Sequence, residues 1–294
     1  MLLYNVLTSI EVLVFLIINH MPRYPVSNAY FKHKAKQYDD VDKQYYWKLS
    51  DDLLWWNLQK FLKKLPKNFK FLDAGGGTGR WSERILHSYP HATGVICDIS
   101  SSMLDVAETK MSREVSQKRL ALVCQPLEEY VNTSSFDVCF NFHNVLGFVK
   151  NPKLTISNLA ASAKKGGYVI SMVPNLYHLL FFTISQNRSS EAFRVMRTGM
   201  GRFTNTMPYI HLFTPESIKK IYKQASLTTI YLSGFPITIY PFFQETQISG
   251  NSHGLSELLG DKTIFNRILK VEKSLYAQPD IASRGNNLFI VGVK

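Results

Sequence analysis

The sequence has few cysteines, and the three it has follow no pattern. Cys97, Cys124 and Cys139 are the only ones among 294 residues, and no two of them have the short spacing of a metal-binding motif. Disulfide frameworks need an even set of cysteines. We therefore exclude a disulfide-stapled secreted domain, predict no metal site, and expect inert, buried thiols in the reducing cytoplasm.

A long uninterrupted apolar segment is also missing. Residues 2–18 are largely apolar, but Glu11 interrupts them and no basic residue precedes them. A spanning helix needs about 20 apolar residues, and a signal peptide needs a positive start and a small-residue cleavage site. We expect no stable membrane insertion. Residues 1–20 are interpreted either as an apolar segment docked on the domain or a surface, or as a stretch upstream of a true start at Met21, which we favour.

Acidic residues are scarce in the second half of the chain. Residues 151–294 hold 16 Lys and Arg against 7 Asp and Glu, whereas residues 1–150 hold 18 against 15, and the whole chain has a net charge of +12. A basic half suggests an anionic substrate or a phosphate backbone, although basic proteins without such partners are common.

Capping residues and apolar spacing predict the order of elements. Ser50, followed by Asp51 and Asp52, predicts the start of a helix that ends before Pro66. Further helices are predicted after the glycine turn at 75–79, after Asp98, from Asn151–Pro152 to Gly166–Gly167, and from Thr214–Pro215. Continuous apolar runs predict strands at 69–73, 93–98, 120–124, 136–142, 168–173, 228–235 and 287–294.

Strands that alternate with helices and are apolar throughout predict a parallel sheet covered on both faces. The expected fold class is α/β: a Rossmann-like, doubly wound, mostly parallel seven-stranded sheet. Residues 21–66 are expected to form a helical N-terminal cap and residues 67–294 the main domain. Ligands bind such sheets at the carboxyl ends of the strands. The polar residues that fall at those ends are Asp73, Asp98, Gln125 and Asn141 to Asn144.

Residues 175–213 interrupt this alternation. They contain the apolar run LYHLLFFTI and four arginines against one glutamate. We interpret the segment as an inserted lid or an apolar wall of a substrate pocket. The arginines form either a clamp for a carboxylate or phosphate or a solvated helix face. They are Arg188, Arg194, Arg197 and Arg202.

The stretch FLDAGGGTGRW, residues 71–81, contains the glycine turn. A phosphate-binding P-loop would end in Gly-Lys-Ser/Thr, but here Arg80 and Trp81 follow the last glycine. The dinucleotide fingerprint would need a glycine where Arg80 stands. The pattern that fits is Asp-x-Gly-x-Gly-x-Gly, formed by Asp73, Gly75, Gly77 and Gly79.

S-adenosylmethionine matches this pattern chemically, because it joins a nucleoside to an amino acid and carries no phosphate. The glycines would let the backbone pass close to the methionine part, and Asp73 suits its ammonium group. Asp98 lies 19 residues after Gly79 and would accept the ribose hydroxyls. The predicted neighbours of the adenine are Ile99 and Met103, with backbone groups of the loop that contains Gln125 and Leu127. Asn141 would contact cofactor or acceptor, unless it only forms a turn.

With CDISSSML and FDVCFNFHNVLGFVKNP, the glycine stretch resembles the class I S-adenosylmethionine-dependent methyltransferases. The segments LLWWNLQKFL, FHNVLGFV and the C-terminal VEKSLYAQPDIASRGNNLFIVGVK are similar to the bacterial tRNA carboxymethoxyuridine methyltransferases and related small-molecule enzymes, over roughly residues 28–294. Two features depart from that subfamily. Gly147-Phe148 replaces an acid-Trp pair, and residues 175–213 have no match.

The resemblance implies methyl transfer by in-line displacement, in which positioning supplies most of the acceleration. His143 is the candidate base at the end of the fourth strand, and its alternative role is to orient the loop or the cofactor. Tyr38 either closes over the cofactor, as the N-terminal segment does in relatives, or only packs.

Three functions follow. The favoured one is methylation of an O or N atom of a small-molecule or peptide acceptor, and the alternative is methylation of a tRNA carboxylate on a modified uridine. The third is a non-catalytic cofactor-binding subunit.

Overall fold

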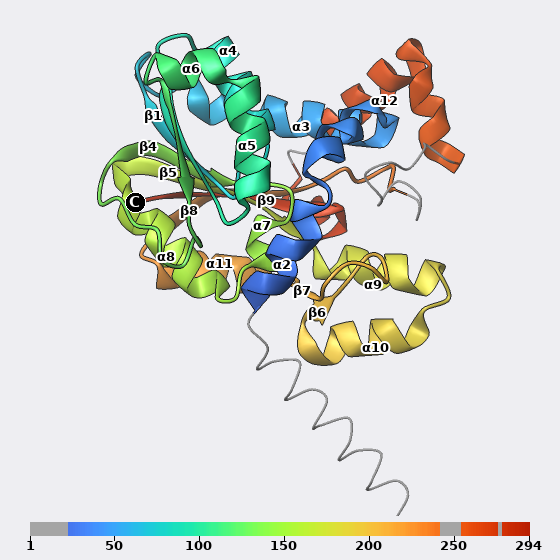
Figure 1. Cartoon of the computed structure of the whole chain (residues 1–294). Helices are drawn as coiled ribbons and strands as arrows, with labels where there is room; N and C mark the ends of the chain where they lie inside the picture. The colour runs from blue at the N-terminus through green and yellow to red at the C-terminus, as the bar shows by residue number, and fades with distance from the viewer. Residues whose placement is uncertain (1–22, 242–253, 276–277) are drawn as a thin grey trace, which may run out of the picture.

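The computed structural model describes residues 23–241, 254–275 and 278–294, which Figure 1 draws in colour. The expectations for residues 1–20 lie outside these described residues. In the part of the chain that is described, no helix is both long enough and apolar enough to span a lipid bilayer.

The described chain begins with three helical segments, α2 (Arg23–Lys32), η1 (Ala35–Lys43) and α3 (Tyr45–Leu62). The predicted helix start at Ser50 is wrong. Tyr46 and Leu49 are fully buried and extend the apolar face of α3 towards its N-terminus, so Ser50 is a buried residue inside the helix. Asp51 and Asp52 are therefore mid-helix side chains that can reach partners on other elements.

One seven-stranded sheet forms the centre of the protein, in the order β3-β2-β1-β4-β5-β9-β8. The strands β1 to β5 pair in parallel, and β9 runs antiparallel between β5 and β8. Their bounds are Lys70–Ala74 (β1), Thr93–Asp98 (β2), Leu120–Cys124 (β3), Phe136–Asn141 (β4), Ala163–Pro174 (β5), Thr228–Phe235 (β8) and Asn287–Val293 (β9). The predicted α/β fold class with a mostly parallel seven-stranded sheet is confirmed.

Alternating side chains give the sheet two apolar faces. In β9, Phe289 and Val291 face one core, and Leu288 and Ile290 face the other. The first core also contains residues of α3, α4 (Arg80–Ser88) and α5 (Ser101–Lys110), and the second those of α8 (Pro152–Ser162) and α11 (Pro215–Gln224). Figure 1 shows these helices on the two sides of the sheet. The short helices α6 (Ser112–Ser116) and α7 (Val145–Phe148) follow α5 and β4.

Of the predicted boundaries of α8 and α11, the two starts are confirmed and the predicted end of α8 is wrong. The Asn151 side chain accepts from the N–H of Leu154 at the start of α8, and Thr214 and Ser217 form a capping box on α11. However, α8 ends at Ser162, and Gly166 and Gly167 lie within β5. Gly166 has φ +77 where the pairing of β5 with β4 shifts register, so these glycines form a bulge rather than a helix end.

Residues 175–213 fold as a separate helical hairpin with a small sheet. The helices α9 (Leu176–Ser185) and α10 (Ser189–Thr198) pack together, followed by β6 (Met200–Gly201) and β7 (Ile210–His211). They enclose a small core of their own, which includes Leu179, Phe182 and Val195. Figure 1 shows this hairpin, in yellow, projecting beside the sheet.

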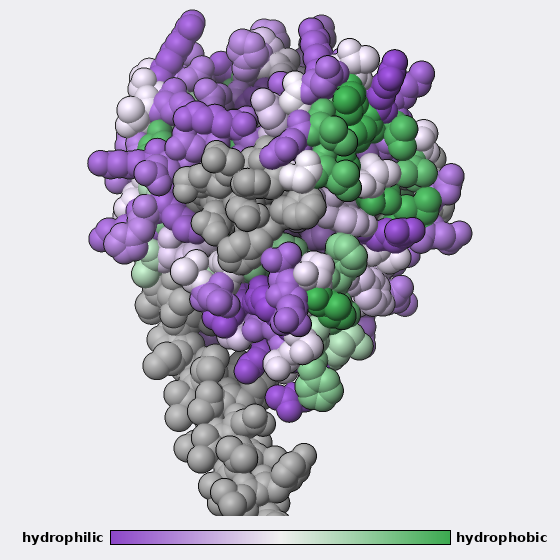
Figure 2. Space-filling model, turned by 90° about the vertical axis from the view of Figure 1, so that its right-hand side faces the viewer, coloured by the Kyte–Doolittle hydropathy of each residue, from purple (hydrophilic) through white to green (hydrophobic). Residues whose placement is uncertain are grey.

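Apolar side chains remain on the surface mainly outside the sheet domain. Polar groups cover much of the face in Figure 2, and apolar ones gather in two areas of it. Strongly exposed examples are Phe181 on α9 and Phe193 on α10, together with Leu255 on η3 (Gly254–Gly260), which precedes α12 (Lys262–Leu275). The segment η4 (Pro279–Arg284) then leads into β9. The sheet thus buries its apolar residues more completely than the added helices do.

Candidate functional site

The first chamber lies at the carboxyl ends of β1 and β2. It has a volume of about 910 Å³ including its opening to solvent. Its walls come mainly from the glycine turn, from the start of the segment after β2, and from the segment that follows β4. Phe31 and Tyr38 cover it from the N-terminal helices. This is the edge of the sheet where ligand binding was predicted.

Two glycines of the turn explain its shape. Gly77 has φ +53 and donates its N–H to Asp98 Oδ2 at 2.9 Å, and a Cβ there would come within 3.1 Å of Met103 Cε. Gly79 has φ +75 at the N-cap of α4, and a Cβ there would overlap Met111 and come within 3.0 Å of Ile96. Gly77 therefore shapes the chamber, whereas Gly79 allows α4 to pack closely on its neighbours.

Three acidic residues line the first chamber. Glu128 accepts hydrogen bonds from the N–H groups of Lys150 and Asn151, which leaves Asp73 and Asp98 as the two carboxylates considered for the ligand. Burial raises the pKa of Asp73 to about 7, although the Ser82 hydroxyl, which donates to Asp73 Oδ2 at 2.7 Å, acts in the opposite direction. Burial also raises the pKa of Asp98, against the hydrogen bonds from the N–H groups of Ser100 and Gly77. Within the described residues, neither carboxylate forms an ion pair. Both are therefore placed to bind a ligand with a positive charge or hydroxyl groups.

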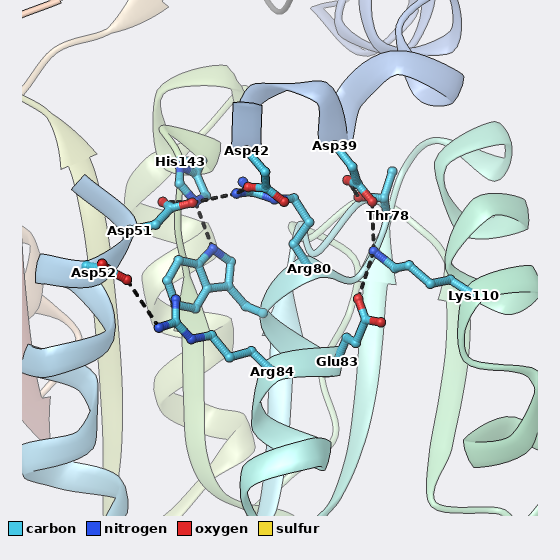
Figure 3. A network of polar contacts seen from close by, with 11 residues as sticks. Asp39, Asp42, Asp51, Asp52, Thr78, Arg80, Glu83, Arg84, Lys110 and His143 are labelled. Atoms are coloured by element: carbon cyan, nitrogen blue, oxygen red, sulfur yellow. Dashed lines mark hydrogen bonds and ion pairs between the residues drawn. The ribbon is translucent and has the colours of Figure 1, made fainter. Parts of the chain in front are cut away.

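A network of charged residues fastens the N-terminal helices to the glycine turn (Figure 3). Arg80 forms ion pairs with Asp42 of η1 and Asp51 of α3. Burial opposes the charge on Arg80, but the two carboxylates outweigh it and raise the Arg80 pKa. Nearby, Asp39 accepts from the Thr78 hydroxyl at 2.6 Å and from Lys110 Nζ at 2.8 Å. The cap is thus held over the chamber by its acidic residues.

His143 lines the first chamber, and its ring already takes part in a hydrogen bond. The indole N–H of Trp81 donates to His143 Nε2 at 2.7 Å. Burial lowers the His143 pKa to about 4, with Asp51 acting in the opposite direction and Arg80 in the same one. At neutral pH the imidazole is uncharged, and its basic nitrogen already accepts a hydrogen bond.

A second chamber of about 890 Å³, including its opening, adjoins the first. The two share five wall residues: Phe31, Tyr38, Arg80, His143 and Phe148. Its other walls come from Tyr30 and Trp47, from Phe203 and Met207 beyond α10, and from a cluster of three asparagines, 144, 286 and 287. The described lining is mainly aromatic and amide in character.

The structure brings most of the predicted cofactor residues to the first chamber. They are Asp73, Gly75, Gly77, Asp98, Ile99, Met103 and Leu127, and the candidate residues Tyr38 and His143 also line it. Three predicted residues do not: Gly79, Gln125 and Asn141. Gln125 donates its backbone N–H to the Asp98 carbonyl, and buried Asn141 donates to Ser171 Oγ at 2.8 Å.

The four arginines of residues 175–213 line neither chamber. Arg188 donates to the carbonyls of Phe203 and Arg202, and Arg202 lies 3.5 Å from Glu191. Arg194 and Arg202 also lie over the Tyr209 ring, and Arg197 is exposed. Most of these side chains therefore make contacts within the hairpin.

Several site residues were not predicted from the sequence. Arg80 and Trp81 were used only to exclude other glycine motifs, although the run of acids at 39–42 and 51–52 was a signal that a buried cation needed partners. Phe148 and the asparagines 286 and 287 carried no local signal, because only the tertiary structure brings them to the site.

Comparison with known proteins agrees with this geometry. The family model described as "Methyltransferase domain" matches residues 46–232, more than half of the chain. A malonyl-[acyl-carrier protein] O-methyltransferase of Priestia megaterium is 24% identical over 81% of this chain and 85% of its own length. A second one, from Ilyobacter polytropus, is 26% identical over 37% of this chain and 41% of its own length.

A tRNA 5-carboxymethoxyuridine methyltransferase of Escherichia coli is 28% identical over 45% of this chain and 51% of its own length, so the match spans only about half of that protein. Among solved structures, a SAM-dependent methyltransferase of Thermotoga maritima is 14% identical, with a TM-score of 0.54 over 91% of this chain and 99% of that one, a likeness that shows the fold alone. With its glycine turn, its sheet order and the match over residues 46–232, the chain belongs to the methyltransferase family and is a class I enzyme that uses S-adenosylmethionine.

Proposed function

We propose that the first chamber binds S-adenosylmethionine and the second binds a small-molecule acceptor. The observation that carries this proposal is the shared wall of five residues, because a methyl group must pass directly from donor to acceptor. Such a junction allows the reacting atoms to approach each other while the surrounding aromatic side chains exclude water.

The residues of the first chamber fit the methyl donor. Asp73 is buried and has no ion-pair partner among the described residues, which suits an ammonium group. The Asp98 oxygens retain lone pairs for two ribose hydroxyls. Ile99, Met103 and Leu127 supply apolar surface beside Asp98 for the adenine ring. Gly75 and Gly77 keep the backbone close to the methionine part.

When bound, the cofactor supplies a sulfonium methyl, which the acceptor atom takes in line as the carbon–sulfur bond breaks and its electron pair passes to sulfur. The chain's own residues then position the two partners. We assign His143 an orienting role, because its Nε2 accepts from Trp81 and its low pKa keeps it neutral. Burial raises the Tyr38 pKa to about 12, so Tyr38 is not a base at neutral pH either. The acceptor O or N atom therefore attacks with its own lone pair, and any proton that it carries is released to water.

We assign residues 175–213 to the acceptor side as an apolar wall, because Phe203 and Met207 line the second chamber. The internal contacts of Arg188 and Arg202 do not favour the substrate clamp predicted for these arginines. Similarity to the tRNA enzyme keeps tRNA carboxylate methylation as the second candidate.

The test is incubation with methyl-labelled S-adenosylmethionine and a lysate separated into RNA, protein and metabolite fractions. We expect label in the metabolite fraction. Label in tRNA, together with tRNA binding that weakens steeply as salt rises, would instead support the second candidate. No transfer to any fraction would contradict both.

A further inference from the structure

The second chamber contains a chain of three amides with a fixed direction. Asn287 Nδ2 donates to Asn144 Oδ1 at 2.7 Å, and Asn286 Nδ2 donates to Asn287 Oδ1 at 3.1 Å. Asn287 opens β9, where the β5 and β8 partners hold its backbone, and Asn144 directly follows His143. Each amide thereby fixes the orientation of the next.

The series of three amides ends in Asn286 Oδ1, an acceptor without a partner in the part of the protein that the structure describes. Asn286 is only 4% exposed, and within the described residues its Oδ1 makes no hydrogen bond. The Asn286 amide cannot turn round to satisfy this oxygen without breaking its bond to Asn287. A buried carbonyl left in this way destabilises a protein by about 1–3 kcal/mol unless a ligand or water pairs with it. Asn286 lines the second chamber, but its Oδ1 is closed to solvent, so a donor bound in that chamber pairs with it only after a small shift of the amide.

The same chamber offers no free cation among its described wall residues. Among the wall residues that the structure describes, Arg80 is the only charged side chain, and Asp42 and Asp51 already pair with it. His143 is neutral. An anion placed here would be desolvated without compensation, which is strongly unfavourable.

The remaining walls are suited to flat apolar groups. Tyr30, Phe31 and Phe148 lie against one another, with ring centroids of Phe31 and Phe148 5.0 Å apart, and Met172 and Met207 add adaptable apolar surface. An aromatic acceptor would extend this cluster.

We propose that the acceptor is an uncharged, ring-bearing small molecule whose O–H or N–H group donates a hydrogen bond to Asn286 Oδ1. This inference rests on the proposed assignment of the second chamber to the acceptor. It differs from the anionic acceptor that the positive charge of the chain suggested.

The experiment measures binding of matched probes to the full-length protein saturated with S-adenosylhomocysteine, so that no turnover occurs. Indole and benzofuran have nearly the same shape, but only indole has an N–H donor. We expect indole to bind about tenfold more tightly than benzofuran, as expected for one buried hydrogen bond. Indole-3-carboxylate, which adds a negative charge, is expected to bind at least about tenfold more weakly than indole.

Variants then locate the preference. Asn286→Leu keeps the side-chain shape and should make indole and benzofuran bind with similar affinity, whereas Met207→Leu in the same wall should leave their ratio unchanged. The comparison of indole with benzofuran in the wild-type protein tests the inference even if Asn286→Leu does not fold. In that case Asn286→Ser, a milder substitution, replaces it. Equal binding of indole and benzofuran, tighter binding of the carboxylate, or no probe binding at millimolar concentration would overturn the inference.

Failure of the proposed function gives a different result. If S-adenosylhomocysteine itself does not bind to the wild-type protein, the assignment of the first chamber is wrong. If it binds but the probes show no donor preference, only the assignment of Asn286 is wrong.

Discussion

The two chambers share five wall residues, one of which is the cation Arg80, but the rest of their walls differ in charge. The first adds the carboxylates of Asp73 and Asp98, which have no ion-pair partner within the described residues, and that of Glu128, which accepts from backbone N–H groups. The second adds no charged side chain among its described wall residues, and the charge of the shared Arg80 is already balanced by two aspartates. A buried charge without a partner favours an opposite charge or hydrogen-bond donors in the ligand, whereas a balanced one does not. The comparison therefore predicts a cationic methyl donor and a neutral acceptor.

Arg80 separates these two environments, and its removal should produce the largest effect. In Arg80→Met, Asp51, with only 10% of its side chain exposed, loses its main partner. We expect the free energy of unfolding to fall by about 3–5 kcal/mol. Urea denaturation measures this, and adding Asp51→Asn should recover much of the loss.

Arg84→Met is the matched control for that substitution. Arg84 lies 3.5 Å from Asp52, and both side chains are about one-third exposed. We expect a loss of at most about 1 kcal/mol. If the two arginine variants were equally stable, the balanced charge of the second chamber would not depend on Arg80, and the comparison would fail.

The first chamber can be tested alone with Asp98→Ala. The variant loses the proposed ribose contacts and the acceptor for the Gly77 N–H. We expect the affinity for S-adenosylmethionine to fall about 100-fold or more, since hydrogen bonds to a charged group contribute about 1.5–3 kcal/mol each. Calorimetry measures the affinity and circular dichroism checks the fold. Affinity within a few-fold of wild type would contradict the ribose assignment.

The chambers also differ in how far the sequence reveals them. Asp73 and Asp98 lie at the carboxyl ends of β1 and β2, and Met103 lies in α5, which follows β2, so their meeting at one edge could be predicted from the alternating pattern. Asn286 and Phe31, by contrast, come from opposite ends of the chain and meet only because the cap and β9 pack there.

The charged residues of the sequence did not by themselves reveal their roles, because each role depends on the side chain with which the residue pairs in the fold. The arginines near α10 looked like a substrate site, but Arg188 and Arg202 mostly satisfy carbonyls and Glu191 of their own hairpin. Asp51 looked like a helix-capping acid, but the buried face of α3 extends beyond it and directs it to Arg80. Spacing along the chain does not show which of these contacts the tertiary structure forms.

Asp73 should make both the stability of the protein and its affinity for S-adenosylmethionine depend on pH. Its pKa of about 7 in the free protein exceeds the ordinary value of 3.8, so its contribution to stability is present at low pH and is lost as the pH rises towards and through 7. Binding of an ammonium group requires the ionised form. We therefore expect the affinity for S-adenosylmethionine to fall about tenfold per pH unit below 7.

Calorimetry measures this affinity between pH 5.5 and 8, a range of about one to two units around the Asp73 pKa. Buffers of different ionisation enthalpy would also detect the proton released on binding. Asp73→Asn should bind weakly at every pH and should melt at a higher temperature than the wild-type protein at pH 8. An affinity that does not change with pH would indicate that Asp73 does not meet the ammonium group.

The smallest effect is expected at His143, on the boundary between the chambers. Gln in place of His143 retains an acceptor for the Trp81 N–H but cannot act as a base at neutral pH. If His143 only orients the junction, His143→Gln should keep kcat within about threefold of wild type, because loss of general-base catalysis would instead cost about 10²–10⁴-fold. The rate is measured with the acceptor that the lysate experiment identifies, between pH 6 and 8, about one unit on either side of neutrality. A large loss with a changed pH profile would make His143 a catalytic base. His143 would then take a proton from the acceptor while the acceptor takes the methyl group. In that case the two chambers would differ in proton transfer as well as in charge balance.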